Sequence, residues 1–167
     1  SFNPPHLGHL GMLRKLSERF GTVIAAVAHN PSKVYAVSPE ERRGLLASMV
    51  AGAGLENVQP VLVGGYVWKY AHARRVSCLF RGVRSIRSDG FDEAYLALLN
   101  MIGPLMLGPL SRPMATRFLA ADPRHRHISS TLIRERLASH EGVSGLVPDA
   151  CAPAVAELYG PGGGSGR

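Results

Sequence analysis

Short, wholly apolar segments alternate along this chain with longer segments of helical periodicity, and this alternation restricts the fold more than any other feature. The apolar segments, predicted to be strands, are Thr22–Ala28, Val58–Val63, Val76–Phe80 and Thr116–Ala120. The predicted helices are 7–20, 39–52, Val67–Arg74, Asp92–Met101, Ser129–Ser139 and Ala150–Tyr159. Apolar runs without a polar face are typical of strands covered on both sides. The alternation therefore predicts an α/β fold, with helices on both faces of a parallel sheet and right-handed connections.

Local signals mark where several of these helices begin. Ser38, Pro39 and Glu41 supply a helix cap, a proline in the first turn and the acidic partner of a capping box. Ser129 and Ser130 open a later helix in the same way. Ligands of open α/β sheets bind beyond the carboxyl ends of the strands. The loops that follow the predicted strands are therefore the places to look for a site.

The charge and composition of the chain limit the classes of binding partner that it can have. The 167 residues carry 19 basic and 12 acidic side chains, a net charge of +7. Excess positive charge favours anionic partners such as nucleotides, RNA or acidic surfaces, without choosing among them. No run approaches the roughly 18 apolar residues of a membrane span, and 46% hydrophobic residues are too many for a disordered chain. Two distant cysteines, Cys78 and Cys151, provide neither a disulfide framework nor a zinc pair.

The chain is long enough for one domain with a substantial core. We predict a single domain over residues 1–159 and a flexible glycine-rich tail over 160–167. Because the sequence begins at a loop-like Ser-Phe-Asn-Pro-Pro segment, we expect a first strand of the sheet upstream of Ser1. A targeting segment would also lie there, so the compartment stays open between the cytoplasm and the mitochondrial matrix.

The sequence His6-Leu7-Gly8-His9 stands where the first loop becomes the first helix. The start of a helix offers unpaired backbone N–H groups and the positive end of the helix dipole, which suit a phosphate. Gly8 allows close approach to the backbone, and the two histidines can face the same anion. The remaining five histidines, including His125 and His127, are predicted to be surface or structural residues.

The segment Ser1–His9 resembles the signature of the nucleotidyltransferase superfamily with the (Thr/His)-x-Gly-His motif, which has a Rossmann-like fold. Its Asn-Pro-Pro-His is similar to the nicotinate-mononucleotide adenylyltransferases. Most of the remaining chain resembles the phosphopantetheine adenylyltransferases of coenzyme A biosynthesis. The segments that carry this second resemblance are Asn30–Lys33, Ser38–Arg42, Phe80–Arg84, Glu93–Asn100, Ile128–Thr131 and Val143–Pro148.

The resemblance implies roles for particular residues. Ser1, Phe2, His6, Gly8 and His9 would bind the nucleotide, and His9 would stabilise the transition state. Lys33 and Arg81 would hold the phosphate groups, bind substrate and share in catalysis, and Tyr66 and Val67 would lie near the pantetheine arm. Arg81 and Arg84 are expected just after the strand 76–80. Further nucleotide contacts are assigned to Gly82, Arg84, Glu93, Ser129, Ser130 and Thr131.

This set is sufficient for adenylyl transfer from ATP to 4′-phosphopantetheine, which gives dephospho-coenzyme A and pyrophosphate. The attacking phosphate is already ionised, so positioning and charge neutralisation are needed and a general base is not. Mg²⁺ would bind chiefly through the phosphates and water. The resemblance also implies a homo-oligomer, commonly a hexamer.

Departures from the family pattern keep two alternatives open. Asn3 stands where an aspartate is usual, Ser85–Asp92 is one residue longer than the pattern, and Met101 stands where an arginine is usual. One alternative is nicotinate-mononucleotide adenylyltransferase activity. The other is a non-catalytic basic scaffold in a ribonucleoprotein, because the acid-free stretch 57–88 carries six basic residues.

Overall fold

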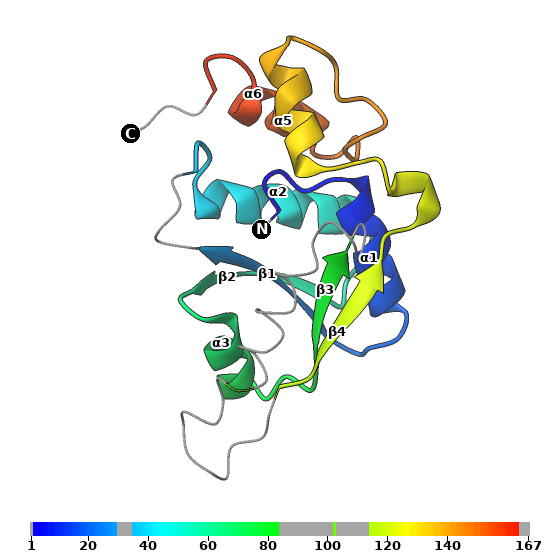
Figure 1. Ribbon diagram of the computed structural model, residues 1–167, viewed down its shortest axis with the longest axis vertical. Coiled ribbons are helices and arrows are strands. Elements are labelled where there is room, and N and C mark those ends of the chain that lie inside the picture. Colours follow the sequence, from blue (N-terminus) through cyan, green and yellow to red (C-terminus); the bar gives the residue numbers. More distant parts are fainter. Residues whose placement is uncertain (1, 30–34, 84–101, 103–113, 164–167) are drawn as a thin grey trace. The chain divides into compact units, whose positions relative to one another are not determined.

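The computed structural model describes residues 2–29, 35–83, 102 and 114–163. Alternating helices and strands make up most of this part of the chain (Figure 1). The elements are α1 (Leu7–Ser17), β1 (Val23–His29), α2 (Pro39–Gly52), β2 (Val58–Gly64), α3 (Val67–Ala73), β3 (Leu79–Val83), β4 (Thr116–Ala120), the 3₁₀ turn η2 (Pro123–His125), α5 (Ser130–Ala138) and α6 (Ala152–Tyr159). The α/β class is therefore confirmed. The helix predicted at Asp92–Met101 lies outside the described residues.

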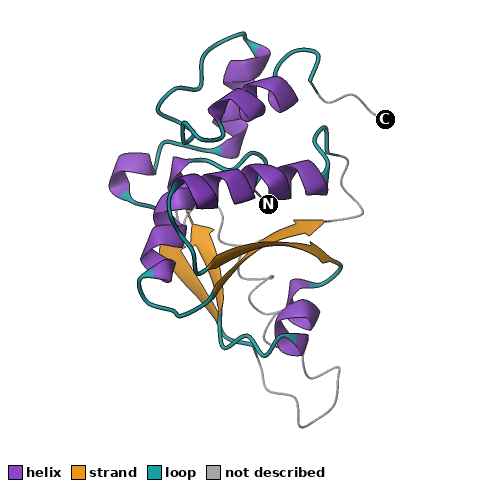
Figure 2. Cartoon of the chain, turned by 180° about the vertical axis from the view of Figure 1, so that it is seen from behind, coloured by secondary structure: helices purple, strands orange, loops and turns teal. Residues whose placement is uncertain are grey.

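Contacts divide the chain into two compact units, one formed by residues 1–62 and 122–167 and the other by residues 63–121. In the first unit β1 is hydrogen-bonded to β2, and both α1 and α2 contact β1. None of the side chains from Val23 to Ala28 is exposed, as a strand covered on both sides requires. Helices α5 and α6 lie against each other (Figure 2).

The core of the first unit is built from the apolar faces of these elements. Val27 of β1, Leu46 and Met49 of α2, Ile133 of α5 and Val155 of α6 are completely buried. Burying a side chain of this size contributes roughly 1.5–3 kcal/mol. The C-terminal helices are thus packed into the same unit as the N-terminal loop.

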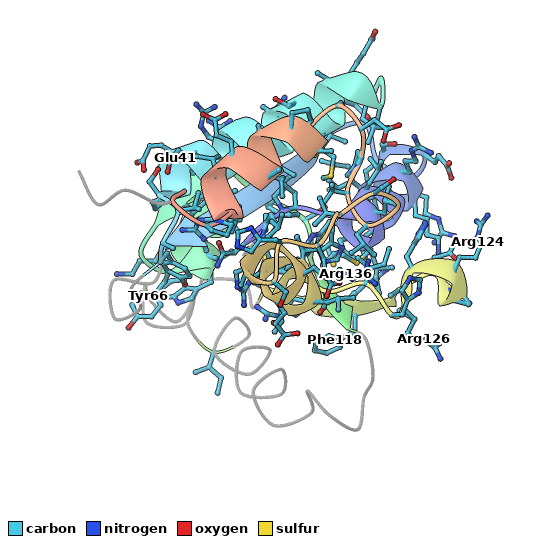
Figure 3. The ribbon with its side chains drawn as sticks, turned by 90° about the horizontal axis from the view of Figure 1, so that it is seen from above. Glu41, Tyr66, Phe118, Arg124, Arg126 and Arg136 are labelled. Atoms are coloured by element: carbon cyan, nitrogen blue, oxygen red, sulfur yellow. The ribbon has the colours of Figure 1, made fainter. Side chains whose placement is uncertain are left out.

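Helix α2 begins as its sequence predicts. The Ser38 hydroxyl accepts a hydrogen bond from the Glu41 amide, and the Glu41 carboxylate accepts one from the Ser38 amide at 2.8 Å. The Ser38 hydroxyl also donates to the Glu41 carboxylate at 2.7 Å, and this bond, together with the one from the Ser38 amide, lowers the pKa of Glu41 below its usual value. Figure 3 shows Glu41 at this end of the helix.

Helix α1 ends one turn earlier than predicted, because Asn57 binds the carbonyl groups at its end. The Asn57 side-chain amide donates to the carbonyl oxygens of Ser17 and Phe20, at 2.9 and 2.8 Å. The Asn57 carbonyl accepts from the Val23 amide at 2.9 Å. The side chain and the backbone carbonyl of Asn57 together therefore fix the turn from α1 into β1.

In the second unit β3 and β4 are parallel neighbours, with Leu79 opposite Thr116 and Val83 opposite Ala120. The prediction for β4 was right at both ends, whereas the strand predicted at Val76–Phe80 begins three residues later. Arg75 has a positive φ of 53°, and the Val76 amide donates back to the Ala71 carbonyl. This six-to-one bond closes the end of α3, so Val76 belongs to the helix cap.

No helix among the described residues is long and apolar enough to cross a membrane.

Candidate active site

The loop before α1 brings three rings together. His6 occupies the N-cap position of α1, and its ring centroid lies 3.7 Å from that of His9. The ring of Phe2 packs against the ring of His9, with 4.8 Å between the two ring centroids. His6 is buried, and Phe2 has a positive φ of 46°. Both histidines therefore stand at the end of the helix that attracts anions.

Gly8 is required by the close approach of the His6 ring. A Cβ atom at Gly8 would lie 3.0 Å from His6 Cε1 and 3.1 Å from His6 Nδ1. Few real Cβ contacts are this short, so any larger residue would displace the imidazole. The glycine thus fixes the position of a predicted site residue in addition to leaving the backbone open.

The start of α5 is joined to this loop. The Ser130 hydroxyl donates to the Pro4 carbonyl oxygen at 2.8 Å, and the Ser129 hydroxyl caps the helix by accepting from the Leu132 amide at 3.0 Å. Thr131 is exposed, and its hydroxyl accepts from Arg134 at 3.3 Å. The structure therefore brings together two predicted groups, 2–9 and 129–131, that are far apart in sequence.

Two residues that the sequence analysis missed also bind the loop. Arg134 donates to the Asn3 carbonyl oxygen, and the Tyr159 hydroxyl donates to Asn3 Oδ1 at 2.6 Å. The amide of Leu7 donates to the Leu146 carbonyl at 3.0 Å. No periodicity or motif in the sequence predicts such hydrogen bonds, since they join segments more than 100 residues apart.

The η2 turn corrects the prediction that His125 is a surface residue. Asp122 caps this turn by accepting from the Arg124 amide at 3.0 Å, and the paired Arg124 side chain lowers the pKa of Asp122 to about 2. The turn places His125 Nδ1, which is buried, beside Gly11 of α1. Two glycines on one face of the helix leave room for it. Arg124 and Arg126 instead extend outward (Figure 3).

A buried arginine lies on α2. Arg42 has no exposed surface, its guanidinium lies 4.2 Å from the centre of the Tyr35 ring, and its Nε donates to the Ser38 carbonyl at 3.3 Å. A buried guanidinium keeps its charge and stacks well on an aromatic face. Arg42 therefore brings a fixed positive charge into the interior of the first unit.

The remaining described candidates belong to the second unit. Tyr66 is the N-cap of α3 and is exposed, Val67 is the first helical residue, and the Tyr66 ring stacks on Trp68 at 6.1 Å. Arg81 and Gly82 lie inside β3, opposite Phe118 and Leu119. The prediction that Arg81 follows the strand is wrong, because the cap of α3 shifts the strand toward the carboxyl end.

Four predicted site residues lie outside the described residues: Ser1, Lys33, Arg84 and Glu93. Among the residues that are described, no cluster of three or more His, Cys, Asp or Glu side chains could hold a metal ion. The polar side chains among the described site residues are those of two histidines, two serines, one threonine, one tyrosine and one arginine. This donor set suits phosphate groups better than a bare cation.

Comparison with known proteins identifies the class of enzyme to which this chain belongs. The model of the cytidylyltransferase-like family matches residues 1–136, so the chain belongs to that family of nucleotidyltransferases. A solved structure titled as a putative nicotinate-nucleotide adenylyltransferase from Vibrio parahaemolyticus has the same fold. Its TM-score is 0.58 at 21% identity, over 95% of this chain and 92% of that one.

The particular family follows from curated relatives. A phosphopantetheine adenylyltransferase from Actinobacillus pleuropneumoniae serotype 3 is 38% identical over 94% of this chain and 93% of its own length. One from Solidesulfovibrio magneticus is 32% identical over 100% of this chain and 91% of its own. Within the nucleotidyltransferases, this chain belongs to the phosphopantetheine adenylyltransferase family.

Proposed function

We propose that this protein transfers the adenylyl group of Mg-ATP to 4′-phosphopantetheine, giving dephospho-coenzyme A and pyrophosphate. The observation that carries the proposal is the His6–His9 pair at the start of α1, 3.7 Å between ring centroids, tied through Pro4 to the start of α5. Relatives that match nearly the whole chain are phosphopantetheine adenylyltransferases, and this supports 4′-phosphopantetheine as the acceptor.

In this reaction a phosphate oxygen of 4′-phosphopantetheine attacks the α-phosphorus of ATP. A new phosphorus–oxygen bond forms as the bond to the β-phosphate oxygen breaks, and the electron pair leaves with pyrophosphate. Negative charge moves onto the departing group and onto the α-phosphate oxygens. Preorganised donors at those positions lower the barrier.

The described residues supply such donors. His9, held between His6 and Phe2, would donate to the α-phosphate in the transition state, and the first turn of α1 would add backbone N–H groups. Ser129, Ser130 and Thr131 would face the nucleotide at the start of α5. Capping and phosphate binding are compatible for Ser129 and Thr131, whose hydroxyls accept hydrogen bonds and keep their protons to donate. The Ser130 hydroxyl already donates its proton to Pro4, so Ser130 would offer its backbone N–H at the start of α5.

The remaining assignments are part of the same proposal. Ser1 and Lys33 would contact phosphates, Arg81 would bind phosphate from β3, and Arg84 and Glu93 would lie near the nucleotide. Tyr66 and Val67 would contact the pantetheine arm. Mg²⁺ would neutralise phosphate charge and would arrive with ATP, which agrees with a described site rich in donors and without a carboxylate cluster. A homo-oligomer, commonly a hexamer in the family, is proposed on the resemblance alone.

Measuring pyrophosphate release tests the proposal. The protein is incubated with Mg-ATP and either 4′-phosphopantetheine or nicotinate mononucleotide. We expect turnover with the first acceptor only. Turnover only with the second would establish the nicotinate alternative, and RNA binding by a folded protein inactive with both would support the scaffold alternative. Location in the cytoplasm stays a prediction; the relatives reported above are bacterial and lend no support to the mitochondrial matrix.

A further inference from the structure

The side chain of Tyr159 joins the C-terminal helix to the N-terminal loop. Tyr159 is the last residue of α6, and its hydroxyl donates to Asn3 Oδ1 at 2.6 Å across 156 positions of sequence. The same asparagine accepts from Arg134 of α5 through its backbone carbonyl. Asn3 is therefore held at two points, one on the side chain and one on the backbone.

Asn3 stands directly between two parts of the candidate site. On one side is Phe2, whose ring lies 4.8 Å from the ring of His9. On the other side is Pro4, whose carbonyl accepts from Ser130. Movement of Asn3 would therefore displace both the aromatic neighbour of His9 and the link to α5.

Phe2 has a backbone conformation that needs such support. Its φ of 46° lies in the left-handed region, where a bulky residue is rarely found. Such a conformation persists when neighbouring contacts fix it. The hydrogen bonds of Tyr159 and Arg134 to Asn3 hold the residue that directly follows Phe2.

Helix α6 gives Tyr159 a firm base. Val155, one turn earlier, has no exposed surface, and neither does Cys151 at the start of the helix. Burial raises the pKa of Tyr159 above its usual range. The positive charges of Arg42 and Arg134 lower this pKa, and the negative charge of Glu41 raises it further. The hydroxyl thus stays protonated, and remains a donor, at neutral pH.

We propose that Tyr159 is a positioning residue for adenylyl transfer: through its hydrogen bond to Asn3 it holds Phe2 and the adjoining His9 in the geometry that binds ATP. This inference rests on the proposed function for its kinetic readout. It adds to that function a residue at the far end of the chain, which acts through Asn3 and touches no substrate.

The test compares Tyr159→Phe, Asn3→Ala, Asn3→Asp and the Tyr159→Phe/Asn3→Ala double variant. Tyr159→Phe removes only the hydroxyl, and we expect kcat/KM for ATP to fall about 3- to 10-fold, as the loss of one hydrogen bond implies. The KM for 4′-phosphopantetheine should not change. Asn3→Asp retains an acceptor beside Arg134 and should stay within about twofold of the wild type.

The double variant separates positioning from general stability. If Tyr159 acts through Asn3, the double variant should be no slower than Asn3→Ala alone, since the second change removes a bond already lost. Tyr70→Phe, the same substitution on α3, is the matched control and should leave kcat/KM unchanged. Melting temperatures should fall by no more than about 2–4 °C.

Wild-type rates for Tyr159→Phe, or effects that multiply in the double variant, would overturn the inference. ATP affinity measured by calorimetry without any acceptor distinguishes this failure from failure of the proposed function. If the wild type does not turn over, a 3- to 10-fold weaker ATP affinity in Tyr159→Phe still supports the positioning role. An unchanged affinity would then overturn it.

Discussion

The hydroxyl of Ser130 donates a 2.8 Å hydrogen bond to the carbonyl oxygen of Pro4, a residue 126 positions earlier in the chain. This bond joins the start of α5 to the loop that ends at His6, one turn before His9 in α1. Ser130→Ala should lower the free energy of unfolding by about 1 kcal/mol, the net value of one such bond. Urea denaturation measures that change. Turnover should fall as well, because the two proposed nucleotide-binding segments lose their direct connection; an unaltered kcat would show that the connection has no catalytic role.

Gly8→Ala tests whether the His6 ring must stay where it is. The new Cβ would lie 3.0 Å from His6 Cε1, so the imidazole must shift. The imidazole must move by a few tenths of an ångström, less than the roughly 1 Å misplacement that lowers turnover about 100-fold, so we expect a smaller but measurable fall in turnover. Steady-state kinetics on Gly8→Ala measure the change.

Gly11→Ala is the matched control for this prediction. It lies one turn later in the same helix, where a Cβ would make an ordinary 3.8 Å contact with His125 Nδ1. It should keep its turnover and gain up to about 1 kcal/mol of stability from helix propensity. Equal turnover in both variants would contradict the proposed need for Gly8.

Ser38→Ala removes the capping box of α2. Both hydrogen bonds made by the Ser38 hydroxyl with Glu41 disappear, and a lost cap destabilises a protein by about 1 kcal/mol. Thermal or urea unfolding detects the change. Ser48→Ala, at an exposed position inside the same helix, is the control and should be neutral or slightly stabilising. A cap variant as stable as the control would show that the box contributes nothing.

Alkaline pH should destabilise the protein through Cys151. Burial raises the pKa of its thiol from 9.0 to about 11. Because the folded state holds the proton more tightly, the stability is complete below pH 9 and is lost as the pH rises toward 11. Two pH units correspond to about 2.7 kcal/mol at most.

Cys151→Ala isolates this contribution. In the variant the fall in unfolding free energy between pH 9 and 11 should be smaller than in the wild type. In the variant the unfolding free energy should still decline above pH 10, because burial also raises the pKa of Tyr159. Identical pH profiles for the two proteins would contradict the prediction.

Local sequence signals predicted most of the fold because they act over a few residues. The capping box at Ser38 and the strand Thr116–Ala120 appear as predicted. The start of β3 was misplaced because Arg75, rather than a glycine, takes the left-handed position that ends α3. A positive φ at an arginine has no sequence signal, so the helix cap and the shift it causes could not be foreseen.

The candidate site was only partly predictable for a different reason. The spacing of His6, Gly8 and His9 follows from one short motif at a helix start, and the structure brings their rings and backbone together. The bonds made by Arg134 and Tyr159 to Asn3 depend on tertiary packing between distant segments. Such pairings become visible only when the chain is folded.

The most direct test of the central claim is the turnover of His9→Ala with Mg-ATP and 4′-phosphopantetheine. We expect kcat to fall at least about 100-fold, the typical effect of removing one transition-state donor, with little change in stability. His140→Asn, which replaces an exposed histidine at the end of α5 by a residue that tolerates its positive φ of 58°, should behave like the wild type. If His9→Ala turns over as fast as that control, His9 has no part in adenylyl transfer and the proposed site is wrong.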